Sequence, residues 1–119
     1  MKISVPVMGE KGMDERVGGH FGKSPGFVIY DTETKNLVTI SNSSEHLGGV
    51  GLPPELLANH GVNVVVCTNL GPKAVDMLAA YNIKVFIGAG GSVKNAIEAW
   101  ENGALEPATV DNACKDHGH

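Results

Sequence analysis

Val62-Asn63-Val64-Val65-Val66-Cys67 is the stretch that decides the fold. It is apolar except for Asn63, and a continuous apolar run of this length is typical of a strand buried on both faces of a sheet. Helix signals lie on both sides of it, so the strand belongs to an alternation of strands and helices. Such an alternation predicts parallel strands joined by right-handed crossovers.

The chain after this strand repeats the strand-helix unit. Pro72 begins a helix with apolar residues at helical spacing. Ile83–Ile87 then reads as another buried strand, followed directly by Gly88–Gly91. Ser92 is a suitable N-cap for a last helix that ends near Gly103.

The chain before Val62 predicts antiparallel strands and one helix. Lys2–Val7 alternates as a first strand, although Pro6 weakens this prediction because proline cannot donate to a ladder. Phe27–Asp31 and Leu37–Ser41 are rich in β-branched or aromatic residues and indicate a hairpin. Two consecutive prolines begin a helix that stops at Gly61.

The predicted fold is an α/β domain with a five-stranded mixed sheet, helices on its faces and the order β-β-β-α-β-α-β-α. Residues 1–105 form this domain, and residues 106–119 form a flexible tail rich in cysteine and histidine. Ligands of open α/β sheets bind beyond the carboxyl ends of the parallel strands. The segments expected at those ends all contain glycine: Met8–Ser24, Thr68–Pro72 and Gly88–Ser92.

Composition excludes several classes of protein. The 119 residues fit one domain, and 42% hydrophobic against 18% charged residues is typical of a globular chain. The net charge of −4 argues against nucleic acid as the main partner, and no apolar run is long enough to span a membrane. We therefore expect a cytoplasmic protein, where Cys67 and Cys114 stay unpaired.

The stretch Val17–Ser24 is the first candidate site. It sets one imidazole, His20, among three glycines and next to Lys23. Glycines let backbone N–H groups approach an anion closely, and histidine adds a ligand nitrogen. Two interpretations remain open: a ligand site, or a surface turn that Phe21 anchors to the core.

The glycine turn Gly88–Ser92 is the second candidate. It lies between a strand and a helix start, where free N–H groups and the helix dipole favour an anion. It matches neither the P-loop nor the dinucleotide fingerprint, so another anion is favoured over a nucleotide. A tight turn that needs positive φ is the alternative.

The tail holds three metal-ligand side chains within six residues: Cys114, His117 and His119. This set suits a transition metal but is incomplete, and a frayed polar terminus is the alternative. Cys67 is expected in the core. No paired acid and base stand out, so we expect no enzymatic activity.

Several of these motifs, in this order, resemble the dinitrogenase iron-molybdenum cofactor biosynthesis family, the small domain of NifX, NifY and the NifB carboxyl terminus. The resemblance covers the chain to about Gly103 and rests on the run Val17–Pro25, Gly48–Gly51 with Leu56–Ala58 and Gly61-Val62, Gly71–Ala74, and Ile87–Gly91 with Ala96-Ile97.

The resemblance implies a ribonuclease H-like three-layer fold without nuclease residues, and a role in holding or carrying a metal-sulfur cofactor or its precursor. His20 matches the histidine of the family's His-Phe-Gly motif, whereas Gly18 stands where a residue such as serine is frequent. Cofactor-assembly or acceptor proteins are the implied partners. The expected cofactor-binding residues are Gly18, Gly19, His20, Phe21, Gly22, Lys23, Gly90 and Gly91, with His20 and the tail residues as metal ligands.

Three functions follow from these patterns. The first is a non-enzymatic carrier or scaffold for an iron-molybdenum-type or other metal-sulfur cofactor, because a glycine-lined mouth with an imidazole and a lysine can hold a bulky anion reversibly. The second is a regulatory module that binds a small anion or nucleotide at Gly88–Ser92. The third, an enzyme of unknown class, lacks a visible acid and base.

Overall fold

The computed structural model describes residues 1–42 and 53–109. These residues build one sheet of the order β3-β2-β1-β4-β5-β6. β1, β4 and β5 run parallel, whereas β2, β3 and β6 are antiparallel to their neighbours. The strands are β1 (Lys2–Val7), β2 (Gly26–Asp31), β3 (Leu37–Ser41), β4 (Val64–Val66), β5 (Lys84–Ile87) and β6 (Glu106–Pro107).

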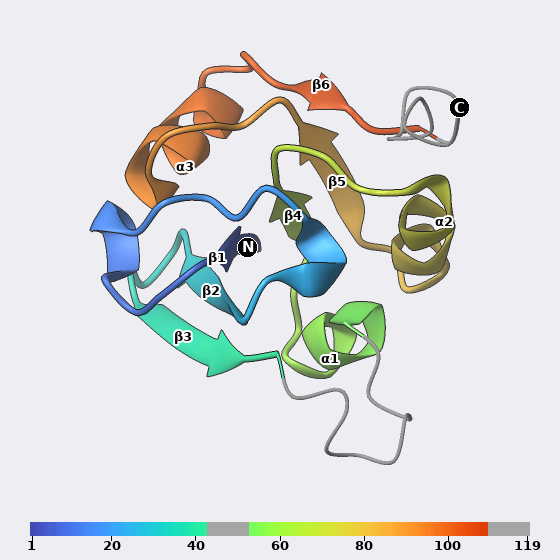
Figure 1. Cartoon of the computed structure of the whole chain (residues 1–119), viewed down its shortest axis with the longest axis horizontal. Coiled ribbons are helices and arrows are strands. Elements are labelled where there is room, and N and C mark those ends of the chain that lie inside the picture. The colour runs from blue at the N-terminus through green and yellow to red at the C-terminus, as the bar shows by residue number, and fades with distance from the viewer. Residues whose placement is uncertain (43–52, 110–119) are drawn as a thin grey trace.

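Helices cover both faces of the sheet, so the domain has three layers (Figure 1). α1 (Pro53–Asn59) and α2 (Pro72–Ala80) pack on one face, and α3 (Val93–Glu101) packs on the other. Ser92 caps α3 as predicted, since its hydroxyl accepts from the Asn95 N–H and the Asn95 side chain accepts from the Ser92 N–H. No helix among the described residues could cross a bilayer.

The sheet has six strands, which corrects the prediction of five. The added strand, β6, pairs its two residues with Phe86 and Ile87 of β5, and Ala108 N–H then donates to the Val85 carbonyl. Glu106-Pro107 shows no alternation and contains proline, which is depleted in strands. Pairing with the edge of β5 makes this segment a strand.

Pro6 lies in a central strand without disrupting it. β1 pairs in parallel with β4 at Ser4↔Val65, and β4 ends at Val66, so Pro6 lies beyond the end of its parallel neighbour. Beyond the end of β4, the loop that follows β1 pairs with β1 instead: Gly18 N–H donates to the Pro6 carbonyl at 2.7 Å. Residues 15–18 therefore lie beside the end of β1, in the position that a longer β4 would occupy.

Residues 15–18 are also bonded to the start of α3. Val17 N–H donates to the Gly91 carbonyl at 2.9 Å, and Val93 N–H donates to the Glu15 carbonyl at 2.8 Å. Glu15 is buried, and its carboxylate accepts from the backbone N–H groups of Lys11 and Arg16. These bonds fix the loop that leads to His20 at the carboxyl ends of the parallel strands, as predicted for ligand-binding segments.

Candidate ligand cleft

A cleft of about 620 Å³ opens beside the turn that carries His20. Its size falls within the range of small-molecule sites, roughly 300–1,000 Å³. Segments far apart in sequence form its walls: the turn 19–23, the start of α1, the loop after β4 and the first turns of α2. The lining residues are Gly19, His20, Phe21, Gly22, Lys23, Pro53, Pro54, Thr68, Asn69, Leu70, Gly71, Lys73, Ala74 and Met77.

The turn with His20 is anchored by buried contacts on its inner side. Phe21 is buried and its ring contacts the ring of Phe27, with centroids 5.3 Å apart. The His20 carbonyl accepts two hydrogen bonds, from the Ser24 hydroxyl at 2.8 Å and from the Lys23 N–H at 3.2 Å. Phe21 therefore anchors this segment to the core, and His20 and Lys23 are left at the surface.

Asn42, directly after β3, fastens the same turn from the side. Its side-chain amide donates to the Ser24 carbonyl at 2.9 Å and to the Gly22 carbonyl at 3.4 Å, and its backbone N–H donates to the Pro25 carbonyl. The hairpin strand β3 thus helps to set the position of the turn.

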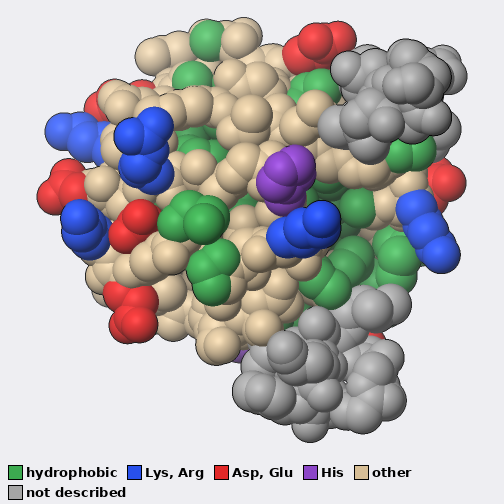
Figure 2. Space-filling view, viewed as in Figure 1, with side chains coloured by type: hydrophobic (Ala, Val, Ile, Leu, Met, Phe, Trp, Pro, Cys, Tyr) green, Lys and Arg blue, Asp and Glu red, His purple; other side chains and the backbone are tan. Residues whose placement is uncertain are grey.

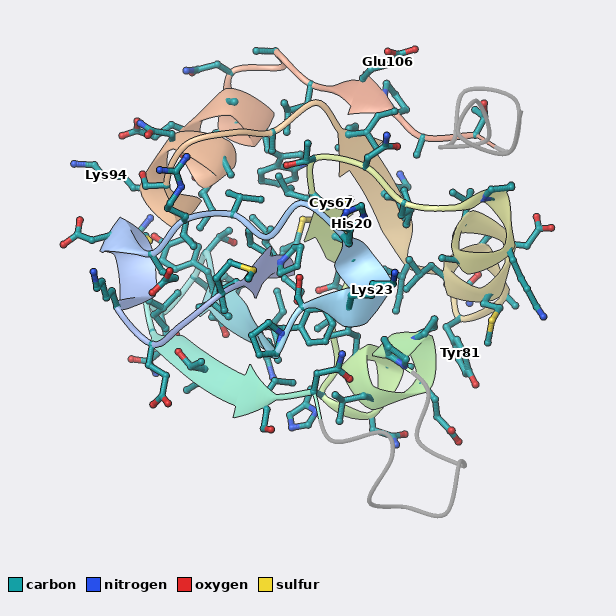
Figure 3. The ribbon with its side chains drawn as sticks, viewed as in Figure 1. His20, Lys23, Cys67, Tyr81, Lys94 and Glu106 are labelled. Atoms are coloured by element: carbon teal, nitrogen blue, oxygen red, sulfur yellow. The ribbon has the colours of Figure 1, made fainter. Side chains whose placement is uncertain are left out.

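His20 and Lys23 are exposed at the mouth of the cleft, on the turn that crosses in front of β4 (Figure 3). Among the described residues, neither the imidazole nor the ammonium group has a hydrogen-bond or ion-pair partner. Both groups are free to contact a ligand.

The charge of the cleft favours an anion. Lys23 and Lys73 line it from opposite sides with His20, and its described lining contains no aspartate or glutamate. α2 also begins here, with Gly71 as an N-cap that has no side-chain cap, so the positive end of the helix dipole adds to the potential. Figure 3 labels His20 and Lys23 near the middle of this face, and Figure 2, in the same view, shows hydrophobic side chains towards the side on which Figure 1 places α2.

Three of the predicted glycine donors lie outside the lining. Gly18 is buried beneath the turn, where a Cβ would collide with the Ser24 hydroxyl. Gly91 has φ of 73° and its carbonyl accepts from Val17, and Gly90 next to it has open space around its Cα. The structure thus brings five of the eight predicted residues together: Gly19, His20, Phe21, Gly22 and Lys23.

Three of the five backbone N–H groups of the turn Gly88–Ser92 have partners, since those of Gly88, Ala89 and Ser92 donate to the Thr68 carbonyl, the Cys67 carbonyl and the Asn95 side chain. Val93 N–H donates to Glu15 and Asn95 N–H donates to the Ser92 hydroxyl, so two first-turn donors of α3 are occupied. Gly88 and Gly91 both have positive φ, as a tight turn requires. Of the two interpretations of this segment, the structure favours the tight turn.

Cys67 is a free, buried thiol at the end of β4. Burial raises the pKa of this thiol from its ordinary value of 9.0 to about 12, so it stays protonated and is a poor nucleophile. It is a core residue, as expected. Cys114, His117 and His119 lie outside the described residues, and residues 1–42 and 53–109 hold no group of three metal-ligating side chains.

Only part of the wall opposite His20 is predicted from the sequence. The sequence places Thr68–Pro72 near the ligand because it follows a buried strand, and the family resemblance includes Lys73 within Gly71–Ala74. Met77 has only the spacing of an ordinary position on an amphipathic helix. The available signal was a proline-started helix beginning directly at a strand's carboxyl end, which places its first turns at the ligand edge.

The fold and the cleft define a class: a three-layer α/β domain with a cleft lined by cationic side chains at the carboxyl ends of its parallel strands. Residues 1–103 match the family described as dinitrogenase iron-molybdenum cofactor. The chain belongs to this family, which confirms the resemblance seen in its motifs.

Other proteins share both sequence and architecture with this chain. It is 32% identical over 111 residues to an uncharacterized protein of Methanocaldococcus jannaschii, covering 89% of this chain and 90% of the relative. The apo form of the orange protein from Desulfovibrio gigas superposes with a TM-score of 0.77 at 27% identity, covering 90% and 92% of the two chains. A putative NifB protein from Thermotoga gives 0.75 at 27% identity, covering 89% and 91%.

Proposed function

We propose that this protein is a non-enzymatic carrier or scaffold that binds an anionic metal-sulfur cofactor, or a precursor of one, in the cleft beside His20. The single observation that carries this proposal is the lining of the cleft, which combines an unpaired imidazole with two lysines and has no carboxylate among its described residues. An iron-molybdenum-type cluster is the cargo that the family suggests.

In this proposal His20 is the metal ligand or closest contact, because imidazole suits iron and related metals. Lys23 and Lys73 would offset the negative charge of the cargo, and the backbone N–H groups of Gly19 and Gly22, which line the cleft, would donate to it. Proteins that keep iron-sulfur clusters permanently use several cysteine thiolates. A site with a single imidazole favours reversible holding and delivery over electron transfer.

The fold class, the partners, the location and the remaining predicted site residues belong to the same proposal. The hairpin followed by parallel strand-helix units supports the ribonuclease H-like class that the family implies. Delivery requires cofactor-assembly or acceptor proteins as partners, in the cytoplasm. Gly18, Gly90 and Gly91 would then support the loop around the cargo, and Cys114, His117 and His119 would recruit metal from the tail.

An anaerobic visible-absorption titration of the untagged apo-protein with a preformed anionic iron-molybdenum-sulfide cluster tests the proposal. We expect saturable binding of one cluster per chain, weakened about tenfold or more in His20→Ala, which corresponds to roughly 1.4 kcal/mol. Lys23→Gln and Lys73→Gln should each weaken binding, most clearly at low salt.

His60→Ala is the matched control, because His60 is an exposed histidine at the end of α1 whose ring contacts the Leu56 carbonyl, away from the cleft. It should bind like the unaltered chain. A chain ended at Ala113 separates the tail from the cleft. Binding lost only in that shortened chain would move the site to the tail, and no binding by the intact chain would refute the carrier function.

A further inference from the structure

The two sides of the cleft differ in chemistry. The turn 19–23 presents the imidazole and ammonium groups of His20 and Lys23, whereas the far side, which we call the apolar wall, carries few donors. The apolar wall consists of Pro53, Pro54, Leu70, Ala74 and Met77. These side chains are buried or half-buried yet line the cleft, so a ligand there meets carbon and sulfur atoms rather than water.

The polar residues near the apolar wall add little hydrogen bonding. The Thr68 hydroxyl donates to the Ala89 carbonyl at 2.7 Å, so its proton is already used. The Asn69 side-chain oxygen accepts from Leu70 N–H at 2.9 Å, which leaves only its amide hydrogens for a ligand. Lys73 supplies charge at the helix start.

α2 arranges this contrast along one face. Met77 follows Lys73 by four residues, so the two side chains lie on the same side of the helix, and both line the cleft. A ligand that lies along this face can therefore pair with the Lys73 ammonium and contact the polarisable thioether of Met77.

Anions of the same charge and shape respond differently to such a wall. Oxo groups are strong acceptors, and burying a strong acceptor against carbon without a hydrogen bond costs free energy. Sulfide groups are larger, more weakly hydrated and more polarisable. They therefore lose less hydration free energy on leaving water, and they gain dispersion contacts with the apolar wall.

We propose that the apolar wall, with Leu70, Ala74 and Met77 as its main residues, makes this cleft select sulfide-faced anions over oxo anions of equal charge and geometry. The inference rests on the proposed function and deepens it, since it names the chemical surface that the cargo presents. It assigns specificity to the apolar wall, and affinity to His20 and the two lysines of the cleft.

Molybdate and tetrathiomolybdate are the matched probes, because both are tetrahedral dianions of the same metal. Anaerobic equilibrium dialysis of the full chain carrying Cys114→Ser measures both affinities without a reactive tail thiol. We expect tetrathiomolybdate to bind at least about tenfold more tightly than molybdate.

Variants of the apolar wall assign the cause. Met77→Gln and Ala74→Ser add donors and should each move the affinity ratio towards one, mainly through tighter molybdate binding. Met77→Leu keeps the wall apolar and should keep the ratio. Ala80→Ser, the same replacement on the same helix but outside the cleft, should leave it unchanged, and His20→Ala should weaken both anions equally.

The outcomes separate this inference from the carrier function. Equal affinity for the two anions, or a ratio that Met77→Gln and Ala74→Ser do not alter in folded protein, overturns the selectivity. Failure to bind tetrathiomolybdate overturns it as well, while cluster binding lost in His20→Ala would still support the carrier. Loss of binding by every probe, the cluster included, refutes both.

Discussion

The hydroxyl of Ser24 donates a 2.8 Å hydrogen bond to the carbonyl oxygen of His20, and Ser24 is buried. This bond closes the turn from which the imidazole projects. Gly18 lies directly against the same hydroxyl, and a Cβ at Gly18 would occupy its place. The geometry of the cleft mouth therefore depends on a contact made beneath it.

Gly18→Ala should destabilise the fold, because the new methyl group displaces the Ser24 hydroxyl in a packed region. Overpacking of this kind costs about 1–3 kcal/mol. Gly19→Ala is the matched control, since Gly19 has open space around its Cα and no positive φ. Urea unfolding measures both variants, and equal stability for the two would contradict the packing seen at Gly18.

Ser24→Ala should remove most of the penalty of Gly18→Ala. The single replacement loses one hydrogen bond, worth about 0.5–1.5 kcal/mol, but it also clears the space that the Gly18→Ala methyl group needs. The double variant should then be more stable than the sum of the two single changes predicts. Additive free energies of unfolding would show that the two residues do not compete for this space.

Cys67 should make stability fall at alkaline pH. Burial raises the pKa of its thiol to about 12, whereas the unfolded thiol ionises near its ordinary value of 9.0. Between these values the unfolded state releases a proton that the folded state retains, so stability declines with rising pH by up to about 1.4 kcal/mol per pH unit. Unfolding free energies between pH 9 and 11 should decline less steeply in Cys67→Ala, and parallel slopes would contradict the buried, protonated thiol.

Ser92→Ala should weaken the start of α3. The change removes the side chain that caps the helix and leaves the Asn95 N–H without its partner, a loss of about 0.5–2 kcal/mol. Ser41→Ala, on the exposed side of β3, serves as the control. Because the cap lies outside the cleft, cluster affinity should stay unchanged in Ser92→Ala, and a loss of affinity would return the turn Gly88–Ser92 to the ligand site.

Most of the fold could be predicted from the sequence because its strands and helices have strong local patterns. The alternation of Lys2–Val7, the apolar run Val62–Cys67 and the Ser92 cap each correspond to an observed element. Glu106-Pro107 has no such pattern, and its strand state reflects pairing with β5. A two-residue strand that depends on a distant partner cannot be found from local periodicity.

The candidate site was only half visible in the sequence. The turn 19–23 stood out because glycines, a histidine and a lysine interrupt the apolar pattern. The apolar wall did not stand out, because Leu70 and Met77 are apolar residues of the kind expected in any core. Gly91 stood out as a donor, yet it supplies a carbonyl to Val17 and a positive φ to the turn, which depend on tertiary contacts.

The open space around Gly19 and Gly22 has an evolutionary consequence. Support for the turn comes from the buried residues Phe21 and Ser24, while an added Cβ at Gly19 or Gly22 would meet no other atom of the protein within 4 Å. A lineage can therefore replace the outward residues and change what the cleft recognises at small cost to folding. Under the carrier function proposed above, a few such replacements would adapt the same domain to a different cofactor.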